Sequence, residues 1–253
     1  MAYTQLILQY TQGADVEKIS GESSHYRLSI PAGTADQYRL AQLDDYAKIA
    51  RSRFPHKAPV SLNLSARVSS HPIPGTWGFG FWNYPFGMSL GFGGTGWRLP
   101  TLPNAIWFFG ASKENYLSFR TEGNESAANG FLAQSFCSPK FHPLLIPAGL
   151  VLPFSRKLAR RLLGKVIGED GIRLAADPTQ WHSYHLDWRE RRVSFSVDGT
   201  LVFESSVSPN PPLGLVIWID NQYAAFTPEG KIGFGVLENA EPAWLEVRDI
   251  NLT

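Results

Sequence analysis

Tryptophans that stand beside amide and carboxyl side chains are the residues of this chain best suited to bind a ligand. The chain has eight tryptophans. Trp82 is followed by Asn83, and Trp218 is followed at a short distance by Asp220 and Asn221. An indole face can stack on the apolar face of a sugar ring, while amides and a carboxyl group supply the few directional hydrogen bonds that a pocket needs. These residue types predict a binding site, although core packing is the alternative for each tryptophan taken alone.

Other residues with reactive side chains do not form a recognisable metal site. His182 and His185 are three positions apart on a predicted strand, so their side chains point to opposite faces, unlike a metal-binding pair. Cys137 is the only cysteine, which excludes an internal disulfide and favours a small buried side chain. A structural calcium stays open as an alternative, but no Asp-rich loop is present to which it could be assigned. We therefore predict no cofactor and assign no metal ligand.

The elements that would position these side chains are predicted to be short β-strands. Aromatic residues make up 13% of the chain, with 23 glycines and 18 prolines against 18% charged residues, a composition that favours many short strands and tight turns. In the segment 181–204, apolar residues recur at every second position from Val193 to Val197, which is the period of a strand. Asp198 and Gly199 then supply the positive φ angles of a two-residue hairpin turn.

The strand pattern extends over the whole chain, and we predict a single domain, residues 1–253. In the strand 76–83, Trp77 and Phe79 are predicted to share the face opposite Trp82. Residues 36–53 lack a clear period and are predicted to be mostly loop. The predicted strands cover residues 3–10, 24–30, 60–70, 76–83, 104–110, 115–120, 130–136, 181–188, 192–198, 200–206, 213–219, 230–236 and 243–252.

Three segments carry strand motifs that occur together in one known group of proteins. Residues 181–204 contain WHxYxxxW and VDGxxV, residues 65–82 contain an Ala-Arg pair followed by a Gly-x-Trp and a Phe-Trp, and residues 244–252 read as a closing strand. Together they resemble the concanavalin A-like jelly rolls, especially the laminarinase-like glycoside hydrolases of family 16. The resemblance implies an all-β fold, a two-sheet antiparallel jelly-roll sandwich.

The resemblance also implies a concave cleft on one sheet, toward which the conspicuous aromatic residues converge. The end of the strand 76–83, the strand 104–110 and the segment after residue 217 all approach such a cleft in these proteins. The predicted ligand contacts are Trp82, Asn83, Trp107, Trp218, Asp220, Asn221 and Tyr223.

The catalytic motif of the resembling hydrolases is missing from its expected strand. Family members carry a Glu-x-Asp-x-Glu-like run whose carboxylates face the cleft, because retaining hydrolysis needs two carboxyl groups. The matching segment here, residues 104–110, has no carboxylate, and Glu114, Glu122 and Glu125 have a different spacing. We predict a non-hydrolytic protein that binds a carbohydrate or a small apolar ligand. The alternative is an enzyme, either a divergent glycoside hydrolase or one that acts on an apolar substrate in the same cleft.

Residues 143–168 interrupt the β pattern with a predicted helical insertion. An uncharged segment rich in proline and leucine, 143–153, leads into a segment in which apolar residues recur every four positions from Phe154 to Val166. This spacing predicts an amphipathic helix. Its predicted contact residues are the five cations Arg156, Lys157, Arg160, Arg161 and Lys165.

The five cations concentrate positive charge on this one helix. The whole chain has a net charge of +1, so the remainder without these five residues stands at −4. A basic amphipathic helix is typical of proteins that bind the surface of an anionic membrane. Residues 154–167 are therefore predicted to contact a peripheral anionic membrane or a protein partner. The alternative is a helix that packs on the sandwich or covers the cleft.

Charge and hydropathy of the whole chain narrow the remaining possibilities. A net charge of +1 disfavours a general nucleic-acid binder, which normally shows a broad basic excess. The first ten residues have neither a basic leader nor a long apolar core, so we expect no secretion signal and a cytoplasmic location. No apolar run reaches the length that spans a membrane.

Overall fold

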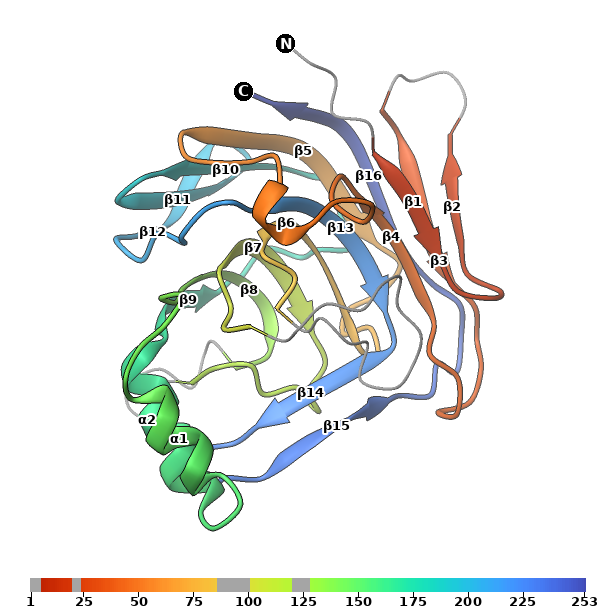
Figure 1. Cartoon of the computed structure of the whole chain (residues 1–253). Coiled ribbons are helices and arrows are strands. Elements are labelled where there is room, and N and C mark those ends of the chain that lie inside the picture. The colour runs from red at the N-terminus through yellow and green to blue at the C-terminus, as the bar shows by residue number, and fades with distance from the viewer. Residues whose placement is uncertain (1–5, 20–23, 86–100, 120–127) are drawn as a thin grey trace.

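Two antiparallel sheets form the body of the protein (Figure 1). The computed structural model describes residues 6–19, 24–85, 101–119 and 128–253. The first sheet has the strand order β1 (Ile7–Tyr10), β4 (Leu40–Asp44), β13 (Gly214–Asp220), β6 (Thr76–Trp82), β7 (Ala105–Ala111), β8 (Gly130–Cys137) and β9 (Gly168–Arg173). The second has the order β12 (Thr200–Ser205), β11 (Arg192–Val197), β10 (His182–Arg189), β5 (Val60–Val68), β16 (Ala243–Leu252), β3 (Tyr26–Ile30) and β2 (Asp15–Lys18). The predicted jelly-roll sandwich is confirmed.

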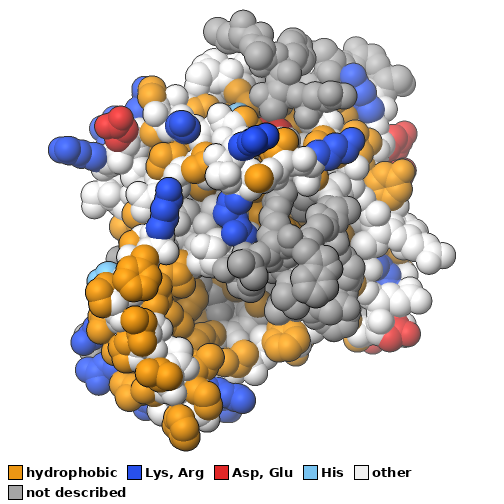
Figure 2. Space-filling model, viewed as in Figure 1, with side chains coloured by type: hydrophobic (Ala, Val, Ile, Leu, Met, Phe, Trp, Pro, Cys, Tyr) orange, Lys and Arg blue, Asp and Glu red, His pale blue; other side chains and the backbone are white. Residues whose placement is uncertain are grey.

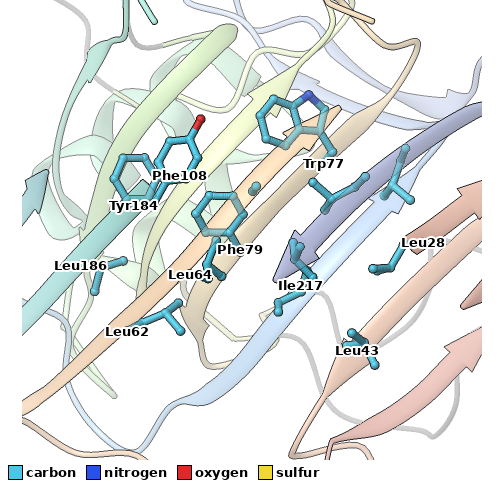
Figure 3. Close-up of a cluster of buried hydrophobic side chains, with 14 of the residues drawn as sticks. Leu28, Leu43, Leu62, Leu64, Trp77, Phe79, Phe108, Tyr184, Leu186 and Ile217 are labelled. Carbon is cyan, nitrogen blue, oxygen red and sulfur yellow. The ribbon is translucent and has the colours of Figure 1, made fainter. Parts of the chain in front are cut away.

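The main hydrophobic core lies between the two sheets (Figure 3). β6 turns Trp77, Phe79 and Phe81 toward this core, as the period of two in its sequence predicts. The ring of Phe79 meets that of Tyr184, from the opposite sheet, edge to face at 5.0 Å between centroids. Because this face of β6 is filled by core side chains, its other face is left to carry Trp82 toward the far side of the sheet.

Two helices interrupt the sandwich between β8 and β9, where the insertion was predicted. α1 spans Leu145–Val151 and α2 spans Arg156–Val166. Pro147 is tolerated in the first turn of α1 because the backbone N–H that it lacks would have no partner there. Ser155 caps the start of α2, because its hydroxyl accepts a hydrogen bond from the backbone N–H of Leu158 at 3.3 Å.

Residues 36–53 are mostly loop, as predicted, but they also contain a strand that was not predicted. This segment contains β4 and a short 3-10 helix, Arg51–Arg53. Ala41 and Leu43 of β4 face the core between the sheets, and the polar residues Gln42 and Asp44 are on the opposite, outer face. Because these polar residues are buried, the sequence of β4 does not show the alternation expected of a strand with one solvent-exposed face. Their side chains satisfy each other, because the Gln42 amide donates to the Asp44 carboxylate at 2.8 Å.

The prediction of a strand at 115–120 was wrong over its described part, residues 115–119. There Tyr116 makes only an isolated parallel bridge to Ala225. The side chain of Asn115 holds the segment as a loop by donating to Gly75 O at 3.2 Å and accepting from Ala224 N at 3.0 Å. The predicted strand 3–10 appears as β1, and its residues 3–5 lie outside the described ranges.

Three further short strands were not predicted at all. β2 and β9 have the polar sequences DVEK and GEDGIR, which show no apolar alternation. The third, β14 (Gln222–Phe226), pairs with β15 (Ile232–Val236) in a separate two-stranded hairpin. This hairpin runs along the side of the first sheet that faces away from the second sheet (Figure 1).

Candidate functional site

A cavity of about 420 Å³ lies between the first sheet and the segments that cover its outer face. One wall of the cavity is formed by β4, β6, β7, β8 and β13. The other walls are formed by the β14–β15 hairpin and α2. Leu163 of α2 lines the cavity, and so does Ile167, which directly follows the helix. The lining is mostly aliphatic and aromatic, which is the usual character of a site for a small molecule.

Three tryptophans form a continuous aromatic wall of the cavity. The rings of Trp82 and Trp218 are parallel within 4°, with centroids 5.9 Å apart. Trp107 lies 5.9 Å from Trp82 and 5.8 Å from Trp218, tilted by 57° and 56°. The three indoles come from β6, β7 and β13, which are neighbours in the sheet, so strand pairing sets their spacing.

Glycines on β6 make room for these rings. A Cβ atom on Gly78 would lie 2.8 Å from Cη2 of Trp218, and one on Gly80 would lie 2.9 Å from Cβ of Trp107. Both distances are shorter than real Cβ contacts allow. The cavity-facing side of β6 is therefore bare between Thr76 and Trp82, and indoles from the two neighbouring strands occupy that space.

The three indole N–H groups already donate to protein acceptors. Trp82 Nε1 donates to the Tyr46 hydroxyl at 2.7 Å, and Trp218 Nε1 donates to Thr76 Oγ1 at 3.0 Å. Trp107 Nε1 makes a longer bond of 3.4 Å to Gln134 Oε1. The indoles are thereby fixed in orientation and offer mainly their ring carbons to the cavity.

Asp220 is the one carboxyl group among the described residues that line the cavity. Its Oδ1 accepts a hydrogen bond from Thr76 Oγ1 at 2.6 Å, and its Oδ2 accepts one from the Tyr38 hydroxyl at 3.3 Å. Burial raises the pKa of Asp220 from 3.8 to about 7. Near neutral pH this carboxyl group therefore exists in both protonated and ionised forms and can donate or accept a hydrogen bond.

Two further buried carboxylates on this side of the sheet do not line the cavity. Asp44 accepts from the backbone N–H groups of Tyr46 and Ala47 at 3.0 and 2.7 Å. Glu169 accepts from Phe119 N at 2.6 Å. Both carboxylates hold loops that border the site, so neither stands opposite Asp220 as a second acid facing the cavity.

The structure brings most of the predicted ligand contacts together. Trp82, Trp107, Trp218, Asp220 and Tyr223 all line the cavity. The strand predicted to lack carboxylates is β7, whose cavity-side positions hold small or aromatic residues. Of the three glutamates with a different spacing, Glu114 is exposed, and Glu122 and Glu125 lie outside the described residues.

Asn83 and Asn221 do not line the cavity, and we leave them out of the site. The Asn83 amide donates to Leu102 O at 2.9 Å and accepts from the backbone N–H of Asn104 at 3.1 Å. The Asn221 amide donates to Leu237 O at 2.8 Å and accepts from Arg39 N at 2.8 Å. Both side chains join loops because each residue follows the last residue of a strand, where backbone groups have no ladder partner.

Sequence reasoning missed several residues of the site. Tyr38 and Tyr46 lie in the segment predicted to be loop, and no local pattern marks either of them as a partner of Asp220 or Trp82. A hydrolase pattern was also overlooked, since residues 87–91 read Gly-Met-Ser-Leu-Gly and match the G-x-S-x-G motif of serine hydrolases. That segment lies outside the described residues.

The predicted basic helix is divided between two environments. Arg156, Lys157, Arg161 and Lys165 are exposed, whereas Arg160 is buried. The guanidinium of Arg160 donates to Phe226 O and Ser118 O, both at 2.7 Å, and lies 5.6 Å from the centre of the Tyr116 ring. Burial lowers the pKa of Arg160. Its expected role as a surface contact is therefore corrected, because it attaches α2 to the cavity wall.

Within the described part of the chain, no group of three or more His, Cys, Asp or Glu side chains is arranged to hold a metal ion. None of the helices described here is long and apolar enough to cross a membrane.

No protein-family model and no curated protein matches the sequence. Solved structures match it over nearly its whole length. A family 16 endo-glucanase from Bacteroides ovatus, in complex with G4G3G-2F-DNP, is 9% identical with a TM-score of 0.48 and covers 100% of this chain and 96% of its own. The κ-carrageenase of Pseudoalteromonas carrageenovora, in complex with an oligotetrasaccharide, is 12% identical with a TM-score of 0.48 over 98% and 94% of the two chains.

A third match is the GlcNAcα1-4Gal-releasing endo-β-galactosidase of Clostridium perfringens, 12% identical with a TM-score of 0.47. It covers 98% of this chain, which spans 59% of that protein. The first of these structures is a family 16 glycoside hydrolase, the family that the sequence was predicted to resemble, and at 9–12% identity the likeness concerns the fold alone. The candidate site is defined by the residues of this chain alone.

Proposed function

We propose that this protein binds a small ligand with a largely apolar body and one polar group, without hydrolysing it. The observation that carries the proposal is the 420 Å³ cavity, in which three tryptophans form one wall and Asp220 is the one carboxyl group of the described lining. Apolar ligand surface buried against these rings leaves water, which stabilises a complex by roughly 25 cal/mol per Å². A polar group of the ligand would meet Asp220 and Tyr38.

The polar groups of the three cavity tryptophans and of Asp220 already have hydrogen-bond partners within the protein, which favours a ligand whose body is apolar. The indole N–H groups already donate within the protein, and Asp220 already accepts from Thr76 and Tyr38. A ligand with many hydroxyl groups would lose its water partners here and find few replacements. Each buried hydroxyl left without a partner costs about 1–3 kcal/mol.

A carbohydrate is the second candidate ligand, and one observation favours it. Trp82 and Trp218 present parallel rings whose planes differ by only 4°. Such a pair can stack on the apolar face of a sugar ring, as the fold resemblance led us to predict. The sugar's hydroxyl groups would then have to project toward Asp220 or out of the cavity.

Hydrolysis is the competing function, and the lining argues against its two-carboxylate form. Glycosidases use two carboxyl groups about 5–10 Å apart. The described lining supplies Asp220 alone. The Gly-Met-Ser-Leu-Gly segment keeps a serine-dependent reaction on an apolar ester as a separate possibility to be tested.

Tryptophan fluorescence and calorimetric titration test the proposal with two probes, 1-decanol and a β-1,3-glucan hexasaccharide. We expect decanol to bind and to change the emission of the cavity indoles. Trp107→Ala should weaken decanol binding at least about tenfold, since a large apolar contact is worth about 1.5–3 kcal/mol. Trp244→Ala is the matched control, because Trp244 lies on β16 of the other sheet and does not line the cavity.

Three outcomes would contradict the proposal. Binding of the hexasaccharide without binding of decanol would favour the carbohydrate ligand. Release of reducing sugar from β-glucan that is lost in Asp220→Asn would establish a glycosidase. Hydrolysis of a p-nitrophenyl ester that is lost in Ser89→Ala would establish a serine esterase.

A further inference from the structure

The outer surface of the helical insertion exposes an unusual number of large apolar side chains. Phe154, in the turn between α1 and α2, is 90% exposed, and Leu150 at the end of α1 is 69% exposed. Figure 2 shows hydrophobic side chains gathered over the two helices, with Lys and Arg at the edges. We name as the insertion patch the exposed apolar residues Phe141, Ile146, Leu150, Leu152, Phe154 and Leu158.

The charged residues of the insertion itself have one sign. Arg156, Lys157, Arg161 and Lys165 are exposed on α2, and none of them forms an ion pair with another described residue. The sequence from 138 to 168 contains no Asp or Glu. The surface therefore complements an anionic partner.

The helical geometry places apolar and basic side chains on the same outward face. Successive residues of an α-helix turn by 100°, so Leu158, Arg161 and Lys165 lie within one 60° sector of α2. The opposite face is occupied, because Arg160 is bonded to the cavity wall and Leu163 lines the cavity. The helix is thus held by its inner face, and its outer face combines apolar and cationic groups.

We propose that the insertion patch docks this protein on an anionic lipid membrane. Phe154 and Leu150 enter the boundary between headgroups and acyl chains, while Arg161 and Lys165 extend to the lipid phosphates and carboxylates. A membrane fits this surface because it offers apolar depth and negative charge together. Docking would bring α2, which is also a wall of the ligand cavity, against the lipid surface.

Co-sedimentation of the full chain with lipid vesicles tests the proposal. We expect binding to vesicles that contain about 30% phosphatidylserine and little binding to pure phosphatidylcholine, because each cation near the surface contributes about a fivefold gain in partition. Raising the salt to about 0.5 M should release the protein, since screening then acts within a few ångströms.

Paired variants separate the two halves of the surface. Phe154→Ser should weaken vesicle binding at least about tenfold, and Leu201→Ser is its control, because Leu201 is 57% exposed but belongs to β12. The charge reversal Arg161→Glu should weaken binding more than about fivefold. Its control is Lys57→Glu, an exposed cation outside the insertion.

Several results would overturn docking on an anionic membrane. One is the absence of binding to phosphatidylserine vesicles at low salt, and another is equal binding to neutral vesicles. A third is a dimer in analytical ultracentrifugation that Phe154→Ser converts to monomer, which would assign the patch to a second copy of the chain. Decanol binding measures the cavity independently, so a failure here leaves the proposed ligand site standing.

Discussion

Among single residues, Asp220 is the one titratable carboxyl group of the described cavity lining. Its carboxyl group lies beside Trp218 and is held by Thr76 and Tyr38, in surroundings that penalise the charged form. A buried carboxyl group whose pKa is raised to about 7 changes its hydrogen-bonding character near neutral pH. A ligand that accepts a hydrogen bond from Asp220 would therefore bind less tightly above pH 7.

Asp220→Asn is expected to make protein stability less dependent on pH. The unfolded chain releases the Asp220 proton near pH 3.8, whereas the folded chain holds it to about pH 7. The free energy of unfolding therefore falls as the pH rises through this window, by up to about 4 kcal/mol from this group. Urea unfolding of both proteins at about pH 4.5, 6 and 8 measures the difference. Equal pH slopes for the two proteins would mean that Asp220 is already ionised at low pH.

At the scale of elements, α2 connects the sheet, the hairpin and the outer surface. Arg160 bonds it to Phe226 at the end of β14 and to Ser118 in the loop that follows β7. Arg160 is a buried cation that attaches the helix to these segments, while its neighbour Arg161 is exposed. These adjacent arginines allow the structural and surface roles of the helix to be separated.

Arg160→Ala is expected to lower the free energy of unfolding by about 2–4 kcal/mol, because two carbonyl groups lose their charged donor. Arg161→Ala should change it by less than about 0.5 kcal/mol, as is usual for a surface site. Chemical denaturation gives both values, and limited proteolysis should cut Arg160→Ala faster within the insertion. Similar losses in the two variants would show that the buried contacts contribute little.

At the scale of the whole molecule, the two large sheets share one core. Trp77 and Trp188, from opposite sheets, are both buried among its side chains. The single domain over residues 1–253 stays a prediction, because a shared core does not show that the whole chain unfolds as one unit. The cytoplasmic location also stays a prediction. Cooperative unfolding is the property that a single core would produce.

We expect urea unfolding to show one transition. Tryptophan fluorescence reports the core and the cavity, and far-ultraviolet circular dichroism reports the strands. The two curves should coincide if the sandwich unfolds as a unit. An earlier transition seen by fluorescence alone would indicate that the cavity cover, formed by α2 and the β14–β15 hairpin, opens separately.

Features that depend on the local spacing of apolar residues could be predicted from the sequence. The alternation from Trp77 to Trp82 assigned each side chain of β6 to a face, and the spacing from Phe154 to Val166 predicted a helix. The absence of carboxylates from β7 could also be read directly from the sequence. The first two predictions depend only on backbone geometry over a few residues, and the third depends only on residue type.

Contacts between distant residues, and the burial that they cause, could not be predicted from the sequence. β4 is stabilised by pairing with β1 and β13, and Gln42 and Asp44 hide its period. Arg160 and Arg161 are alike in sequence, but only the approach of Phe226 and Ser118 buries the first. The pKa of Asp220 likewise depends on covering segments far away in the chain. The spacing of apolar residues along a strand or helix predicts the face on which each side chain lies. The partners of that side chain and its exposure to solvent depend on contacts between segments that are distant in the sequence.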